Sequence, residues 1–394
     1  MRIDRKAHLI FVLIVGLVFV AGCWDRREMD EIALVMASGV DITDDGQLEL
    51  SVQIALPTAI PGTLQTGGTD KKPVQVISVK GRAGLEVFAL LQQQLSRQLF
   101  LGHRAVIVFG EKFAKAGIDQ ALDVLIRMPD SRYNSYVLTS YGTTAKELLN
   151  APYRMEVIPA IGMKNIEAAK YSVAVKVDEF ISDLSTVGKM PVTGAARLFE
   201  DAAGDKTFQI DKAAVYRGNK LAGFLSGKYL KGYKLMSGQA KGMKIAVQVE
   251  PVREKTKGIV TVEILRAKTK VLTHWEKDTP RVTVSFEATS RALANESSLD
   301  LSKANHVRRL ETELTDKLRE TISDMIAKTQ REYRSDILGF GREFHIQHAK
   351  EWKKLKGQWD ELYPEIPVAV AAEMKIERIG RIQAPGPLSK EEVQ

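Results

Sequence analysis

The amino-terminal segment constrains this chain most, because it decides which residues remain to fold. Basic residues lie within positions 2–6, an apolar run occupies positions 9–20, and two small residues precede Cys23. This order of basic, apolar and small residues is typical of a cleaved secretory signal. The apolar run has about 12 residues, whereas a helix needs about 20 to cross the hydrocarbon core of a bilayer. We therefore expect residues 1–22 to be removed as a signal peptide.

The residues at the expected cleavage point resemble the bacterial lipoprotein signal, in which a cysteine thiol that follows small residues accepts diacylglycerol. The sequence Val20-Ala21-Gly22-Cys23 carries this pattern. The resemblance implies that Cys23 carries covalent diacylglycerol and an N-acyl chain such as palmitate, with no other cofactor. Two or more acyl chains make anchoring stable, at about 0.8 kcal/mol per buried CH₂. The alternative is an ordinary cleaved signal in which Cys23 is an incidental thiol.

Cysteine usage and charge limit the classes of function that are open to the mature chain. Cys23 is the only cysteine, so an exported protein has no disulfide framework and, once this thiol is acylated, no cysteine nucleophile. The hydrophobic fraction of 44% is ordinary for a globular protein. The net charge of +8 falls to +6 without residues 1–22, which carry three basic residues and Asp4, and this modest positive charge suits a position near an anionic membrane surface. No cluster of basic and aromatic residues indicates nucleic-acid binding.

Strand-like and helix-like runs alternate through the first half of the chain. Two strand-like runs within residues 32–56 flank Asp45-Gly46, a pair typical of a type I′ hairpin turn with positive φ at both positions. Glu147 lies three residues after Thr144, which predicts a capping box at a helix start. This alternation favours a mixed α/β arrangement.

The pattern of predicted elements changes near residue 192, where consecutive strand-like runs begin. We predict a multidomain α+β protein with an N-terminal α/β domain over residues 23–192. A small β-rich middle domain would follow over residues 193–238. A C-terminal domain would occupy residues 239–384, with a tail over residues 385–394.

Within the predicted C-terminal domain, strand-like runs over residues 244–250, 258–268 and 281–292 precede the longest periodic segment. Apolar residues recur there every three or four positions, as in an amphipathic helix. These residues are Val307, Leu310, Leu314, Leu318, Ile322, Met325 and Ile326. One alternative is a coiled coil with a partner, but the spacing drifts from strict heptads and favours a domain core. We therefore predict a β-sheet packed against a long helix.

Catalytic signatures are absent from the sequence, which contains no HExxH, GxSxG, GxxxxGK[ST] or GxGxxG motif. His345 and His348 could share a helix face, but two imidazoles without a third ligand make a poor zinc site. We therefore expect no metal site and a binding or structural protein that is not an enzyme.

Three stretches resemble the Ger(x)C family, the lipoprotein C subunits of nutrient germinant receptors in endospore-forming bacteria. They are GCWDRREMDEIALVMASGVD at residues 22–41, LGHRAVIVFGEKFAKAGI at 101–118 and RSDILGFGREFH at 334–345. The loop over residues 57–73 has an individual length and composition, so the resemblance assigns it no role.

The resemblance implies a three-domain α+β ectodomain that is lipid-anchored on the outer face of the spore inner membrane. It implies two integral-membrane partners, the A and B subunits of the same receptor. The C subunit would be needed for receptor assembly and for the nutrient response that triggers germination. No catalytic residues come with the resemblance.

Two groups of residues follow as candidates for function. Trp24 lies at the bilayer surface by its position after the anchor, and Asp25, Arg26 and Arg27 are expected to contact a membrane subunit.

The second group, Asp336, Gly339, Phe340 and Gly341, forms a structural motif. The two glycines suit a helix break, since glycine tolerates backbone angles that other residues avoid, with Phe340 packed inward. Further aromatic residues follow and are interpreted as core or interface residues rather than a nutrient cage. They are Trp352, Trp359 and Tyr363.

Two other classes of protein share the anchor. A solute-binding lipoprotein of a membrane transporter should have two similar α/β lobes around a cleft, which the strand-rich second half disfavours. An envelope hydrolase is disfavoured by the missing catalytic motifs.

Overall fold

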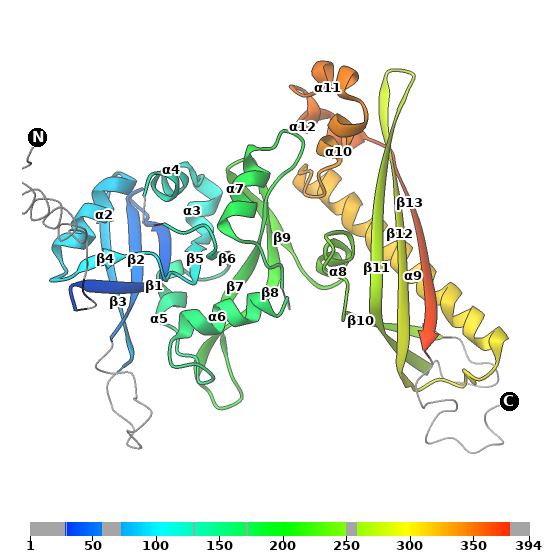
Figure 1. Ribbon diagram of the computed structural model, residues 1–394, viewed down its shortest axis with the longest axis horizontal. Coiled ribbons are helices and arrows are strands. Elements are labelled where there is room, and N and C mark those ends of the chain that lie inside the picture. The colour runs from blue at the N-terminus through cyan, green and yellow to red at the C-terminus, as the bar shows by residue number, and fades with distance from the viewer. Residues whose placement is uncertain are drawn as a thin grey trace, which may run out of the picture.

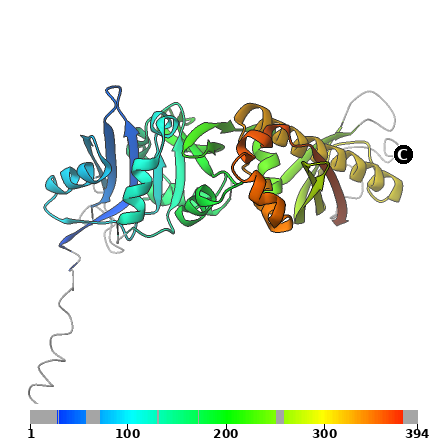
Figure 2. The same cartoon turned by 90° about the horizontal axis from the view of Figure 1, so that it is seen from above.

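Two β-sheets lie end to end along the molecule, and helices cover and join them (Figures 1 and 2). The computed structural model describes residues 28, 30–56, 72–128, 131–170, 172–249 and 258–378. The predicted α+β class is confirmed by this mixture of sheets and helices. Within these ranges no helix has both the length and the apolarity needed to cross a membrane.

The first sheet has the strand order β3-β2-β1-β5-β6-β7-β8-β9, with β4 paired to β1. The strands are β1 (Ile32–Ile42), β2 (Leu48–Ala55), β3 (Val74–Gly81), β4 (Gln98–Phe100), β5 (Val106–Phe109), β6 (Tyr136–Ser140), β7 (Val192–Glu200), β8 (Lys206–Arg217) and β9 (Lys220–Leu225). Its centre is parallel, from β1 through β5 and β6 to β7, and both ends are antiparallel. All four residues of β5 are buried, as expected for a parallel strand covered on both faces.

Helices cover both faces of this sheet because its central strand alternates two apolar faces. Ile107 and Phe109 of β5 belong to the core that contains the apolar residues of α2, α3, α4 and α7. Val106 and Val108 belong to a second core, with α5 and α6. The helices are α2 (Gly84–Gln93), α3 (Glu111–Ala116), α4 (Asp119–Arg127), α5 (Ala145–Asn150), α6 (Pro159–Ala168) and α7 (Val177–Ser185).

The predicted capping box at the start of α5 is confirmed. The Thr144 hydroxyl accepts a hydrogen bond from the backbone N–H of Glu147 (3.1 Å), and the Glu147 carboxylate accepts one from the backbone N–H of Thr144 (2.8 Å). Two backbone donors at this helix start are thereby paired.

The second sheet packs against the long helix α9 (Ala304–Lys328), as predicted (Figure 1). Its order is β10-β11-β12-β13, with β10 (Lys244–Val249), β11 (Gly258–Glu276), β12 (Thr279–Asn295) and β13 (Val368–Arg378). Six of the seven periodic residues of α9 are at most 3% exposed, and Val307 is partly buried. The apolar stripe of α9 is therefore domain core, and α8 (Gly227–Met236) packs beside it.

Two hairpins differ from the sequence-based expectation. The connection from β1 to β2 has positive φ at Gly46 (81°) and not at Asp45, because a longer loop closes this hairpin than the two-residue type I′ turn. Strands β11 and β12 extend beyond the predicted runs and meet at Lys277 and Asp278, whose φ angles are 49° and 58°. No sequence signature marks this turn, because it contains no glycine, although aspartate tolerates positive φ.

Strands β7, β8 and β9 fall in the predicted middle domain, and they continue the first sheet through the pairing of β6 with β7. The predicted boundaries at residues 192, 238 and 384 stay predictions.

Candidate functional site at the junction of the two sheets

The segment after α9 reverses the chain where the two sheets meet. Helix α9 ends in a π-helical turn, Thr329–Tyr333, and Arg334 then takes a left-handed conformation with φ of 49°. Gly339 is also left-handed, with φ of 72°, and is the N-cap of α10 (Phe340–Gln347). Glycine adopts this conformation at little cost, so the predicted helix break lies at Gly339. Phe340 is fully buried, as predicted.

Asp336 holds this reversal together from inside the protein. Its Oδ1 accepts a hydrogen bond from the backbone N–H of Phe340 (3.0 Å), and its Oδ2 accepts one from that of Gly341 (2.8 Å). The indole Nε1 of Trp359 also donates to Oδ2 (2.9 Å). The first N–H groups of a helix have no partner within the helix. The Asp336 carboxylate therefore caps α10 and fixes the position of Trp359.

The environment of Asp336 suits a structural role rather than chemistry. Burial raises the pKa of Asp336 to about 6, because a charged carboxylate loses its hydration, while hydrogen bonds from backbone N–H groups and from Trp359 oppose the rise. At neutral pH the carboxylate is mainly charged. Both of its oxygens are engaged by the fold, so the arrangement positions a helix and presents no group to a substrate.

Gly341 is required for a different reason from Gly339, namely close approach of two backbones. A Cβ atom on Gly341 would lie 2.6 Å from both the Cα of Gly188 and the Nε1 of Trp359. Gly341 has no positive φ, so space rather than backbone freedom explains this glycine. Gly188, in the loop between α7 and β7, has φ of 84°, and a Cβ there would lie 2.7 Å from the Cα of Gly341.

Hydrogen bonds join the motif to the first sheet. Ser335 Oγ donates to the carbonyl of Tyr216 in β8 (2.5 Å), and the backbone N–H of Met190 donates to the carbonyl of Asp336 (2.9 Å). The backbone N–H of Arg342 donates to the carbonyl of Gly188 (3.1 Å). The Asp336 motif is therefore hydrogen-bonded directly to the first sheet and to the loop that precedes β7.

Buried aromatic side chains form the other wall of the junction, as predicted for core or interface residues. Trp352 and Trp359 meet edge to face with ring centroids 5.3 Å apart, and Phe344 packs against both. Tyr363 is 1% exposed, and its hydroxyl shares a hydrogen bond with Thr329 Oγ1 (2.9 Å). Packed rings with paired polar atoms leave no cage for a ligand. These rings lie on α10, α11 (Ala349–Leu355), α12 (Trp359–Leu362) and η3 (Tyr363–Glu365).

His348 and Gln347, at the end of α10, connect this helix to the second sheet, whereas His345 contacts α11. His348 Nε2 lies 2.9 Å from the carbonyl of Thr273 in β11, and the His345 ring stacks on Trp352 at 5.6 Å between centroids. Gln347 Oε1 accepts a hydrogen bond from the backbone N–H of Thr273 (2.8 Å). In the described part of the chain no three His, Cys, Asp or Glu residues are grouped as metal ligands.

A polar cleft of about 950 Å³ lies beside the junction, between α7, α8 and the residues that lead into α10. Its wall includes an ion pair between Lys189 and Asp183 (2.6 Å), together with Glu179, Gln239 and Arg342. Charges of both signs line the cleft, so it does not select one ligand class by charge.

The structure brings together the four predicted motif residues and the three aromatic residues after them. Sequence reasoning missed Gly188, Met190 and Tyr216, which belong to the first half and approach the motif only in the folded chain. A single sequence offers no signal for such long-range pairing. The remaining predicted residues, Cys23 and the stretch 24–27, lie outside the described residues.

Comparisons with known proteins cover both halves of the chain. The family described as "Spore germination protein N-terminal domain" matches residues 25–198, and "Spore germination B3/GerAC like, C-terminal" matches residues 211–380. Spore germination protein KC of Bacillus subtilis (strain 168) is 28% identical, over 95% of this chain and 96% of that relative. Spore germination protein B3 of the same strain is 25% identical, over 97% of this chain and 100% of that relative.

A solved structure supports the fold. The chain matches the crystal structure of the GerBC protein with a TM-score of 0.57 and 21% sequence identity, over 86% of this chain and 96% of that chain. Because the two family matches together span both sheets and the junction between them, the chain belongs to the Ger(x)C family of spore germination proteins.

Proposed function

We propose that this chain is the lipid-anchored C subunit of a nutrient germinant receptor, and that it supports receptor assembly and the response that triggers germination. The observation that carries the role is the family match across residues 25–198 and 211–380, which leaves neither sheet to an unrelated protein. The expected partners are the integral-membrane A and B subunits of the same receptor. The expected location is the outer face of the spore inner membrane.

The anchor would keep the first sheet close to the bilayer. Strand β1 begins at Ile32, nine residues after Cys23. A fully extended chain spans at most about 3.3 to 3.6 Å per residue, so this connection reaches no further than about 30 Å. A lipidated Cys23 would therefore hold the first sheet within contact distance of membrane subunits. Trp24, Asp25, Arg26 and Arg27 lie in this connection.

The site supports a role in assembly rather than catalysis. The junction uses its charged and aromatic side chains to pair with one another, as described for Asp336 and Trp359. The alternative of a solute-binding lipoprotein is not favoured, because a nine-stranded mixed sheet and a four-stranded sheet are not two similar lobes around a cleft.

Purification of the chain from spore membranes tests the proposal. We expect the wild-type chain to carry acyl chains on Cys23 by mass spectrometry and to co-purify with two integral-membrane subunits. A Cys23→Ala variant should leave the membrane fraction and slow nutrient germination. Recovery of acylated chain without any membrane subunit would contradict the receptor role.

Charge reversal tests the expected contact of the tether, residues 24–27, with a membrane subunit. Asp25→Lys with Arg26→Glu should weaken co-purification, whereas reversal of the exposed ion pair Arg127 and Asp123 on α4 should not. Normal assembly and germination with the tether reversed would refute the contact while leaving the anchor intact.

A further inference from the structure

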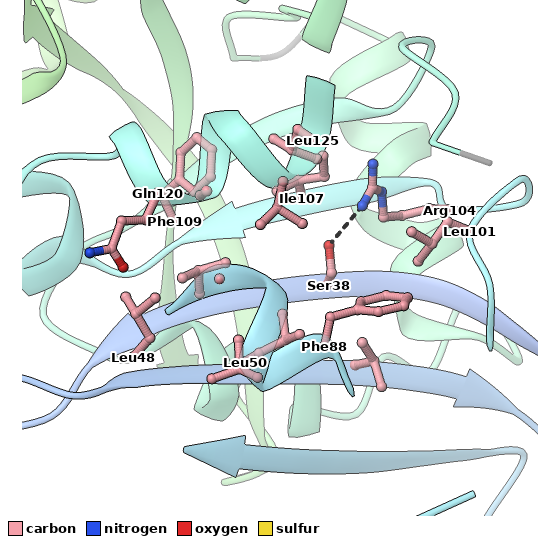
Figure 3. Close-up of a pocket in the computed structure, with 16 residues that line it drawn as sticks. Ser38, Leu48, Leu50, Phe88, Leu101, Arg104, Ile107, Phe109, Gln120 and Leu125 are labelled. Atoms are coloured by element: carbon pink, nitrogen blue, oxygen red, sulfur yellow. Dashed lines mark hydrogen bonds between the residues drawn. The ribbon is translucent and has the colours of Figure 1, made fainter. Parts of the chain in front are cut away.

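Strand β3 leaves one edge of the first sheet open. It is the last strand on its side and pairs with β2 alone among the described strands. Figure 3 shows Ile107 of β5, Ser38 of β1 and Leu50 of β2 on successive strands of this sheet, and β3 follows beyond β2. Helices α2 and α4 pack on the face of these strands. The outer edge of β3 is therefore available to another strand.

The strand register fixes which backbone groups of β3 point outwards. The backbone N–H of Leu56 donates to the carbonyl of Pro73 (2.8 Å), and bonded positions alternate along an antiparallel pair. The odd-numbered residues of β3 therefore bond to β2. The even-numbered residues, whose N–H and C=O groups point away from the sheet, are Val74, Val76, Ser78 and Lys80. Among the described residues none hydrogen-bonds to these outward backbone groups.

Two other terminal strands are covered by side chains. The Tyr333 hydroxyl donates to the carbonyl of Phe224 in β9 (2.7 Å). The backbone N–H of Met374 in β13 donates to Thr315 Oγ1 of α9 (3.0 Å). An open edge invites pairing with another chain, and charged residues usually oppose it. Residues 73–79 contain no charge, so β3 is suited to accept a further strand.

A groove of about 590 Å³ follows the first half of this edge, between β3 and the loop that joins α5 to α6. Apolar side chains from both elements line it, namely Val74, Val76, Leu149, Tyr153 and Val157. Val157 is 49% exposed, and Met155 in the same loop is 80% exposed. Successive side chains of a strand point to opposite faces. Alternate side chains of an added strand would therefore enter this groove.

Gln53 fixes the loop beside the edge. It lies opposite Val76 in the pairing of β2 with β3 and is fully buried. Its Nε2 donates to the carbonyl of Leu149 (2.6 Å), and its Oε1 accepts a hydrogen bond from the backbone N–H of Ala160 (3.2 Å). Both ends of the loop are thus bonded to the sheet. The groove exists before anything binds, which lowers the entropy cost of binding.

The groove lies at the end of the sheet where the tether enters. Val35 of β1 lies opposite Ile54 of β2, which lies opposite Gln75 of β3. Neighbouring strands are about 4.8 Å apart, so Gln75 lies about 10 Å from Val35. Val35 follows Cys23 by twelve residues. An anchored Cys23 would keep the groove near the bilayer, within reach of a segment that projects from a membrane protein.

We propose that the outer edge of β3 binds an extended segment of an integral-membrane subunit as an additional strand, with alternate apolar side chains of that segment in the groove. This inference rests on the proposed function, because it assigns the partner to the same receptor. Main-chain hydrogen bonds give such pairing its affinity, and the pockets beside the edge give its specificity.

Charge and symmetry narrow the choice of occupant. Lys72 and Lys80 lie near the two ends of β3 and are exposed, which favours acidic residues at the ends of the bound segment. A second copy of this chain fits less well. Antiparallel pairing about Ile77 would set Lys80 of the copy opposite Val74, beside the apolar groove.

Photocrosslinking in spores tests the proposal on the full, anchored chain. The photoreactive amino acid p-benzoyl-phenylalanine replaces Val157 in the groove or, as the matched control, Ile126, which is 54% exposed on α4. We expect crosslinks from position 157 to an integral-membrane subunit, in a segment outside the membrane, and none from position 126. Crosslinks to a second copy of this chain, or equal yields from both positions, would overturn the proposal. So would the lack of a crosslink where membrane subunits co-purify. Failure of any membrane subunit to co-purify with the wild type would overturn the proposed function as well.

A proline variant tests the strand pairing itself. Val76→Pro removes an outward N–H at an edge position, where proline is tolerated, and Val76→Ala loses the side chain but keeps the N–H. We expect Val76→Pro to lower the crosslink yield from position 157 at least about fivefold relative to Val76→Ala. Thermal unfolding first shows that each variant is folded, and Val74→Pro, at the first residue of the strand, replaces Val76→Pro if that variant does not fold. An undiminished yield from a folded proline variant would overturn strand addition at β3.

Discussion

Substitution of Gly341 by alanine should separate the two halves of the junction. The added Cβ would lie 2.6 Å from both the backbone of Gly188 and the indole nitrogen of Trp359. Ordinary van der Waals contact begins near 3.4 Å, so the neighbours must move apart by close to an ångström. Neither neighbour is the free end of a flexible side chain. One is main chain, and the other is a ring bonded to Asp336.

The expected magnitude combines three effects. Overpacking in a dense core costs about 1 to 3 kcal/mol, and weakening the hydrogen bond from Trp359 to a charged Asp336 adds about 1.5 to 3 kcal/mol. Alanine is the better helix former by up to about 1 kcal/mol. We therefore expect Gly341→Ala to lower the free energy of unfolding by about 2 to 4 kcal/mol.

Urea denaturation followed by tryptophan fluorescence measures this change, because Trp352 and Trp359 are buried at the junction. Gly357→Ala is the matched control: it lies in the same segment, has no positive φ, and an added Cβ there meets nothing within 4 Å. The control should unfold like the wild type. If Gly341→Ala unfolded within about 0.5 kcal/mol of Gly357→Ala, the close approach would not be a constraint on this fold.

Three further changes probe other parts of the fold. Glu167 is fully buried, neither of its carboxylate oxygens has a hydrogen-bond partner, and burial raises its pKa well above the usual value. The folded chain therefore binds the carboxyl proton more tightly than the unfolded chain does, so the free energy of unfolding should fall as pH rises above about 4.5. Glu167→Gln should remove this contribution to the pH dependence in thermal unfolding measured from about pH 5 to 8. Leu318→Ala in the stripe of α9 should cost about 2 to 5 kcal/mol in urea denaturation, whereas exposed Glu320→Ala on the same helix should cost under about 0.5 kcal/mol. Thr144→Ala should cost about 1 kcal/mol through the lost capping box, and Thr144→Ser should restore most of it.

Local patterns predicted the elements well because their causes are local. The stripe of α9 specifies a helix with one buried face, and the spacing of Thr144 and Glu147 specifies a helix start. The Asp336 motif was also visible in the sequence, since Gly339 and the aromatic residues after it lie within one short segment. The hairpin between β11 and β12 was not predicted, because its turn residues Lys277 and Asp278 adopt positive φ without a glycine that would mark the turn in the sequence.

The partners of the motif could not be predicted, because they are set by how the halves pack. Gly188 and Tyr216 precede Gly341 by more than a hundred residues, and nothing near them in sequence marks them as contacts. The same holds for the buried Arg104, whose side-chain partners Ser38 and Ser131 lie 66 and 27 residues away from it in the sequence. Sequence periodicity reports that a residue is buried, but it does not report whether a buried charge has found a partner.

The junction links the membrane-tethered first sheet to the second sheet through a continuous series of contacts. Strand β1, the first strand after Cys23, lies inside the first sheet between β2 and β5, and hydrogen-bonded pairing continues from it to β8. From β8 the route passes through Ser335 to the Asp336 motif, and from α10 through His348 to β11. Stiff elements joined by buried contacts move together unless a contact yields, and the contact of Gly188 with Gly341 leaves no room for an added Cβ atom. We therefore expect Gly341→Ala spores, compared at matched protein level with Gly357→Ala spores, to respond more slowly to nutrients although Cys23 is unchanged. Equal germination rates would show that the second sheet does not need this connection to the first.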